Sequence, residues 1–170
     1  MCILSRTECD DLNGPSPAGG ERECGDCTAC CDGWLRIEIR GHQVRPGIKC
    51  PFSTAKGCEI YQDRPVDPCR KFVCGWLARR SPLPEWMRPD RSKLILLTAS
   101  FSWRGIPVDA AVPAGKDPEE AALAWLTEFY ASSKKLLVYK TGDEWYAFGP
   151  PAFQQDIRAR VQRGEELWAS

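Results

Sequence analysis

Cysteine crowding constrains the fold of this chain more than any other feature of its sequence. Eight of the ten cysteines lie between residues 24 and 74, and four of them fall in one run, Cys24-Gly-Asp-Cys27-Thr-Ala-Cys30-Cys31. The loops that carry these sulfurs are too poor in apolar residues to fold on a hydrophobic core alone. The density of thiols therefore predicts a module that folds around bound metal.

The compartment decides how these cysteines are used. The first residues, Met1 to Arg6, lack the basic start and the apolar stretch of a secretory signal, so we expect a cytoplasmic protein. A reducing cytoplasm keeps thiols free, which favours metal binding or redox chemistry over disulfides.

The longest uninterrupted apolar run, residues 94–97, is far shorter than the roughly 20 residues of a membrane span. Acidic and basic residues balance at 23 each, so no net charge attracts the chain to a membrane or to nucleic acid.

Composition divides the chain into three regions. Residues 1–23 are rich in proline, glycine and charge, and they predict a flexible leader in which Cys2 and Cys9 are free thiols. Residues 24–80 form the cysteine-cluster module. Residues 81–170 contain no cysteine and have the pattern of an α+β scaffold. We expect one compact α+β unit, in which the loop-rich cysteine module packs on a small antiparallel sheet with two helices.

Periodicity predicts the individual elements. Alternating apolar residues indicate one strand in the module, Trp34–Arg40. Apolar runs rich in β-branched residues predict two antiparallel strands in the scaffold, over residues 92–101 and 106–112, and a second pair over 135–141 and 144–148 turns at Gly142-Asp143. A helix is expected between the pairs, with Asp117 as its cap, Pro118 in its first turn and Glu120 as capping-box partner. Apolar residues at helical spacing predict the buried face of that helix: Ala122, Trp125, Leu126, Phe129 and Tyr130. A second, C-terminal helix is predicted from Phe153, Ile157 and Val161, which recur every four residues.

The spacing of the sulfurs indicates the kind of metal. In Cys-x-x-Cys the two intervening residues turn the chain so that both thiolates face one centre. Cys24, Cys27 and Cys30 form two consecutive pairs, which is the rhythm with which bacterial ferredoxins hold a cubane cluster. Structural zinc sites more often pair one Cys-x-x-Cys with a second one a dozen or more residues away, and no second one follows Cys31. The spacing favours an iron-sulfur cluster, of the 4Fe-4S type, with zinc as the alternative.

The adjacent pair Cys30-Cys31 leaves the number of centres open. Neighbouring side chains in an extended segment point to opposite faces, so these two sulfurs are not equivalent ligands of one metal. Either one binds metal while the other is a packed or reactive thiol, or the two serve separate centres. Four more sulfurs follow downstream, enough for a second site, and the complete set of candidate ligands is Cys24, Cys27, Cys30, Cys31, Cys50, Cys58, Cys69 and Cys74.

The residues around these sulfurs form ordered blocks. After the CxxCxxCC run come Cys50-Pro51-Phe52, then Cys58-Glu59-Ile60-Tyr61-Gln62-Asp63-Arg64-Pro65, then Cys69-Arg70-Lys71-Phe72. The pattern, over residues 24–76, resembles the YkgJ-like cysteine-cluster family, a zinc- or iron-chelating domain. The resemblance implies metal chelation by these cysteines, with Cys74 as an additional one. A related signature occurs in flagellin lysine methylases, so the resemblance also makes a modification enzyme conceivable.

Charged and aromatic residues beside the sulfurs have two interpretations each. Cations could offset the negative charge of a thiolate-bound cluster, or they could form a solvated basic face: Lys49, Arg64, Arg70 and Lys71. Aromatic side chains could shield the centre from water or fill a small core: Trp34, Phe52, Tyr61, Phe72 and Trp76. His42, the only histidine, is expected in a surface turn, with metal ligation as the alternative.

The sequence therefore predicts a metal-binding protein with an iron-sulfur cluster and a redox, sensing or modification role. The alternative is a structural zinc module that mediates a protein interaction. Catalytic residues are not identified, because the sequence has no nucleotide-binding loop and no Ser-His-Asp or similar set. A protein or redox partner is expected, and nucleic acid is disfavoured because the histidine half of a zinc finger is missing.

Overall fold

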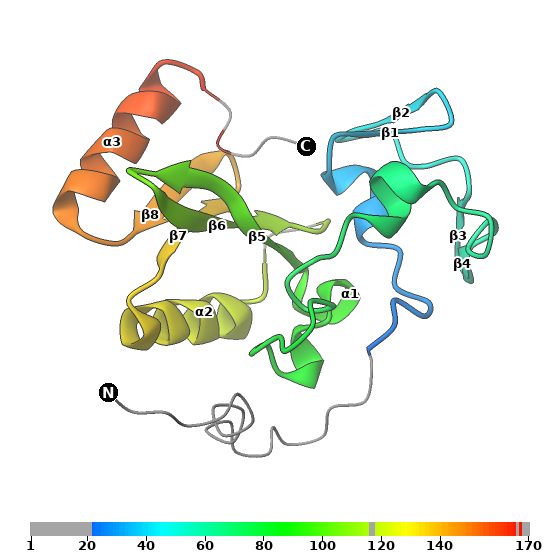
Figure 1. Cartoon of the computed structure of the whole chain (residues 1–170), viewed down its shortest axis with the longest axis horizontal. Helices are drawn as coiled ribbons and strands as arrows, with labels where there is room; N and C mark the ends of the chain where they lie inside the picture. The colour runs from blue at the N-terminus through cyan, green and yellow to red at the C-terminus, as the bar shows by residue number, and fades with distance from the viewer. Residues whose placement is uncertain (1–21, 116–117, 166, 168–170) are drawn as a thin grey trace, which may run out of the picture.

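A computed structural model describes residues 22–115, 118–165 and 167 (Figure 1). The protein has the predicted α+β class, with a mixed sheet in its C-terminal half and short elements in its cysteine-rich half. Cys2, Cys9 and Asp117 lie outside the described residues. Among the helices of the described ranges, none has the length and apolar character needed to cross a bilayer.

The main sheet has four strands in the order β5-β6-β7-β8. They are β5 (Leu94–Trp103), β6 (Ile106–Pro113), β7 (Leu136–Thr141) and β8 (Glu144–Phe148), which confirms the four predicted scaffold strands with small shifts at their ends. The pairs β5–β6 and β7–β8 are antiparallel as predicted, but β6 and β7 are parallel. The expectation of a purely antiparallel sheet is therefore wrong, because a helix connects β6 to β7 and returns the chain to run in the same direction.

Both predicted scaffold helices are present. Helix α2 (Glu120–Ser133) and helix α3 (Pro151–Gln162) lie on opposite sides of the sheet (Figure 1). The expected capping box is wrong: Glu119 occupies the cap position without a side-chain cap bond, and Pro118 precedes the helix. Packing of its buried face, including Leu126 and Tyr130, holds α2 in place without that cap.

The cysteine-rich half contains more regular structure than predicted. Its strands form two small antiparallel hairpins, β1 (Ile37–Ile39) with β2 (His42–Val44) and β3 (Ser53–Thr54) with β4 (Gly57–Cys58). Two short helical segments lie in this half, η1 (Cys30–Trp34) and η2 (Val66–Arg70), and two more, η3 (Glu85–Met87) and α1 (Pro89–Ser92), lead into β5. The predicted strand over Trp34–Arg40 is shorter than expected, because Trp34 belongs to η1 and Arg40 has the positive φ of a tight turn.

Two groups of buried apolar residues support the cysteine-rich half. The main core joins the sheet to Leu35, Cys74 and Trp76, so residues from both halves share it. A smaller core consists of Ile39, Val44 and Cys50. The segment after Cys74 lies against the edge strand β5, where the Gly75 backbone N–H donates to the Leu96 carbonyl at 2.6 Å. The sheet edge thereby fixes one of the cysteines.

Candidate metal centre

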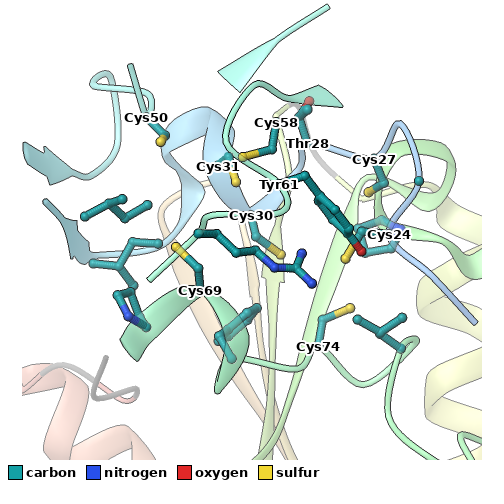
Figure 2. Close-up of a pocket in the computed structure, with 18 of the residues that line it drawn as sticks. Cys24, Cys27, Thr28, Cys30, Cys31, Cys50, Cys58, Tyr61, Cys69 and Cys74 are labelled. Carbon is teal, nitrogen blue, oxygen red and sulfur yellow. The ribbon is translucent and has the colours of Figure 1, made fainter. Parts of the chain in front are cut away.

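All eight cysteines between residues 24 and 74 line one cavity of about 100 Å³ (Figure 2). All eight are free thiols. A space of this size has room for several water-sized molecules, so it admits a group larger than one ion. The sulfurs are spread around the cavity wall, and no three His, Cys, Asp or Glu side chains among the described residues are arranged as ligands of a single metal ion. The structure thus gathers every candidate ligand of the module at one place.

Several chain segments bring these sulfurs together. Cys24 and Cys27 lie in a turn closed by a hydrogen bond from the Cys27 N–H to the Cys24 carbonyl, at 2.9 Å. The adjacent pair Cys30 and Cys31 begins η1. The four downstream sulfurs come from different segments. Cys50 precedes β3, Cys58 ends β4, Cys69 lies in η2 and Cys74 lies in the segment beside β5.

The adjacent cysteines Cys30 and Cys31 face different surroundings. Cys30 packs against the main core, whereas Cys31 packs against the smaller core that contains Cys50. The chain then kinks at Gly33, whose φ is +89°. A Cβ atom at Gly33 would lie 2.7 Å from the Arg45 carbonyl oxygen, so only glycine fits this close approach.

A first set of thiols surrounds Cys74. A hydrogen bond from the Cys30 thiol lowers the pKa of Cys74 to about 7, and backbone N–H groups of Leu77 and Trp76 also favour its thiolate. The same hydrogen bond, together with burial, raises the pKa of Cys30. Burial and the neighbouring Cys74 raise the pKa of Cys24. Cys24, Cys30 and Cys74 are therefore close enough to influence one another.

A second set of thiols surrounds Cys31. Burial and the thiols of Cys50, Cys58 and Cys69 raise the pKa of Cys31 to about 12. Burial, followed by Cys50 and Cys58, also raises the pKa of Cys69. Repulsion among buried thiolates keeps such groups protonated until a cation compensates their charge.

Two buried nitrogen donors, which belong to side chains of the cavity wall, lack a hydrogen-bond partner among the described residues. They are Nε1 of Trp76, a side chain that is 5% exposed, and Nε of Arg64. A buried donor without an acceptor costs about 1–3 kcal/mol. Sulfur atoms of a thiolate-bound metal group would supply such acceptors, so the donors and the eight thiols of the wall both fit such a group.

The basic residues that the sequence indicated differ in their positions. Arg64 lines the cavity and stacks on Tyr61, with the guanidinium carbon 3.7 Å from the ring centre. The Arg70 side chain instead donates hydrogen bonds to the backbone carbonyls of Arg64 and Gln62. Lys71 forms an ion pair with Asp67 at 2.8 Å. Only Arg64 of the predicted cations lies on the cavity wall, and Lys49 is exposed elsewhere.

The predicted aromatic residues and His42 also separate by position. Tyr61, Phe72 and Trp76 line the cavity. Trp34 packs against the main core, and Phe52 packs against the smaller core, so these two fill space away from the cavity wall. His42 is exposed at the start of β2, where its ring contacts that of Phe52 at 6.0 Å between centroids, in agreement with the predicted surface position.

Sequence reasoning missed two polar residues that hold the cysteine loops. Arg88 donates hydrogen bonds from Nε and Nη2 to the two carboxylate oxygens of Asp90. Its Nη2 also forms an ion pair, at 2.9 Å, with Asp26, which lies between Cys24 and Cys27. Asp32 accepts hydrogen bonds from Thr28 at 2.8 Å and from the buried Ser53 at 3.0 Å, which ties the cysteine run to β3. The aspartates within and after the CxxCxxCC run were the only available signal.

A third such residue falls in the region assigned to the leader. Arg22 donates to the Trp76 carbonyl at 2.8 Å and to the Leu83 carbonyl at 2.9 Å, and it lies over the Trp76 ring. The described chain is therefore anchored to the cavity wall before the first cysteine of the run.

Comparison of the chain with protein-family models, with curated proteins and with solved structures gives no match. The resemblance to the YkgJ-like family accordingly rests on the cysteine blocks of the sequence and stays a prediction.

Proposed function

We propose that this protein binds metal, in the form of an iron-sulfur cluster held by the clustered thiolates, and that it uses the metal in a redox, sensing or modification role. One observation carries the proposal: the eight cysteines of residues 24–74 line a single cavity as free thiols. Thiols spread over a long stretch of chain gather in this way where sulfur ligation is needed.

The electrostatics of the cavity support metal binding. Burial and neighbouring thiols raise the pKa values of Cys30 and Cys31, so the metal-free protein keeps these sulfurs protonated. A metal cation replaces the protons and removes the repulsion between thiolates. Metal binding therefore stabilises the fold. The cysteine-rich half needs such stabilisation, because its strands are short and its own buried core has only three residues.

The surroundings of the sulfurs favour an iron-sulfur cluster. Such clusters are held by thiolates, and hydrogen bonds to their sulfur atoms set the reduction potential. Backbone donors at Cys74 and the unpartnered nitrogens of Trp76 and Arg64 are available for this purpose. When bound, the cluster would supply one-electron chemistry, and these residues would orient it and shield it from water.

A structural zinc module is the second candidate. The small hairpins β1–β2 and β3–β4 are typical of loops that a tetrahedral ion holds in place, and zinc accepts four thiolates. In that case the metal would stabilise a surface for a protein partner. A modification enzyme of the methylase kind rests on the sequence signature alone.

Metal analysis of anaerobically purified protein tests the proposal. We expect bound iron with equimolar acid-labile sulfide and a broad visible charge-transfer absorption that dithionite bleaches. Stoichiometric zinc without iron would reject the iron-sulfur assignment and favour the structural module. Protein that takes up neither metal, even after reconstitution with iron and sulfide, would reject metal binding.

Binding of S-adenosylmethionine separates the enzymatic version from the others. Equilibrium dialysis of the metal-loaded protein with the labelled compound is the measurement. Absence of binding would remove the methylase version and leave the redox and sensing roles.

A further inference from the structure

We propose that the cavity holds two separate four-thiolate centres, one bound by Cys24, Cys27, Cys30 and Cys74 and the other by Cys31, Cys50, Cys58 and Cys69. The inference rests on the proposed metal-binding function and assigns each of the eight thiols to a centre. Figure 2 shows the second set on one side of the pocket and Cys24, Cys27 and Cys74 on the other, with Cys30 between them.

Packing separates six of the eight thiols into two groups, independently of any charge. Cys74 belongs to the main core, and Cys27 and Cys30 pack against it. Cys50 belongs to the smaller core, and Cys31 and Cys69 pack against that one. The boundary between the two cores therefore passes between the adjacent residues Cys30 and Cys31. Cys30 and Cys31 begin the helical segment η1, where consecutive side chains do not face each other, so we assign them to different centres.

Backbone contacts hold the first set together. The turn that joins Cys27 to Cys24 carries two sulfurs at the spacing of metal-binding pairs. Cys74 comes from the edge of the sheet, where the Gly75 backbone N–H donates to the Leu96 carbonyl, and it lines the same cavity as this turn. Arg88 fixes the turn from the other direction through Asp26.

Backbone contacts also hold the second set together. The Cys50 N–H donates to the Cys31 carbonyl at 2.7 Å, which places these two residues side by side. Cys58 pairs with Ser53 across the β3–β4 hairpin, and Ser53 in turn donates to Asp32, the residue after Cys31. Cys69 enters from η2, which contacts β1 of the same small core.

Coordination chemistry agrees with this division. Four thiolates complete one four-iron cluster, so two sets of four use all the cysteines of the described residues. The two centres would lie next to each other, because one peptide bond joins Cys30 to Cys31. Electron exchange between them, or joint support of the fold, follows from that proximity.

Alanine variants of the adjacent cysteines test the division. We expect Cys30→Ala and Cys31→Ala each to retain about half of the wild-type metal, since each breaks one four-ligand centre. The double variant Cys30→Ala/Cys27→Ala should retain the same half, because both residues serve one centre. The double variant Cys30→Ala/Cys58→Ala should retain none. Cys9→Ala, outside the run, is the control and should keep the full content.

The division is overturned if Cys30→Ala/Cys58→Ala retains as much metal as either single variant, or if a single variant loses all metal while its circular dichroism stays native. Where a variant fails to fold, paramagnetic resonance of the reduced wild type decides. Two adjacent iron-sulfur centres give a signal split by spin coupling, and one isolated centre gives an unsplit signal. Metal-free wild-type protein would instead reject the proposed function itself.

Discussion

Gly33 offers a quantitative test of how the cysteine run is held. Its φ of +89° lies in the left-handed region, where an alanine costs about 1–2 kcal/mol. The added Cβ would also lie 2.7 Å from the Arg45 carbonyl oxygen and 3.0 Å from that of Ile48. These neighbours are backbone atoms that cannot rotate away, so overpacking adds about 1–3 kcal/mol. Gly33→Ala should therefore destabilise the protein by about 2–5 kcal/mol.

Gly47→Ala is the matched control for this substitution. Gly47 has a φ of +86°, but a Cβ there would meet nothing within 4 Å. It should cost only the backbone part, about 1–2 kcal/mol. Urea unfolding of both variants and of the wild type, each with the same excess of metal, gives the free energies of unfolding. Equal losses in the two variants would refute the close packing of Gly33 against residues 45–48.

Three further predictions concern the cavity wall and its metal. Arg88→Met should release the loop that carries Asp26 and speed metal loss to a chelator, whereas Met at the exposed Arg91 should leave the rate unchanged. Trp76→Phe should lower the reduction potential of the bound cluster, because it removes a buried N–H donor. Trp86→Phe, at an exposed position, should leave the potential unchanged. Equal potentials in the two variants would contradict the role of Trp76. Metal removal should lower the melting temperature and expose the amides of residues 24–74 to hydrogen exchange before those of the sheet, and unchanged melting would contradict the link between metal and folding.

The scaffold was largely predictable because its elements follow simple patterns. Strands β5 to β7 contain short continuous runs of buried apolar residues, and helices α2 and α3 carry theirs at a spacing of about four. The parallel pairing of β6 and β7 was missed, although a helix between two strands is the usual sign of it. The cap of α2 was misplaced because packing, including Tyr130 bonded to Asp109, outweighs cap chemistry there.

For the cysteine-rich half, the sequence predicted that its eight cysteines gather at one place, but it predicted less of the structure that holds them. The Cys-x-x-Cys spacing singled out the first run, and the count of sulfurs and the motif blocks added the four downstream cysteines; all eight line the cavity. The spacing left open whether Cys30 and Cys31 serve one purpose, since that depends on which core each side chain enters. The roles of Arg88 and Asp32 depend on contacts between distant loops, which local patterns do not record.

X-ray absorption at the iron edge of anaerobically purified protein tests the central claim most directly, since it reports the atoms bonded to the metal. Ligation by the clustered cysteines predicts a first shell of sulfur only, with an iron–iron distance typical of a cluster and no nitrogen contribution from His42. A first shell of oxygen or nitrogen, or iron without a neighbouring iron, would contradict the assignment of the cysteine cavity as an iron-sulfur site.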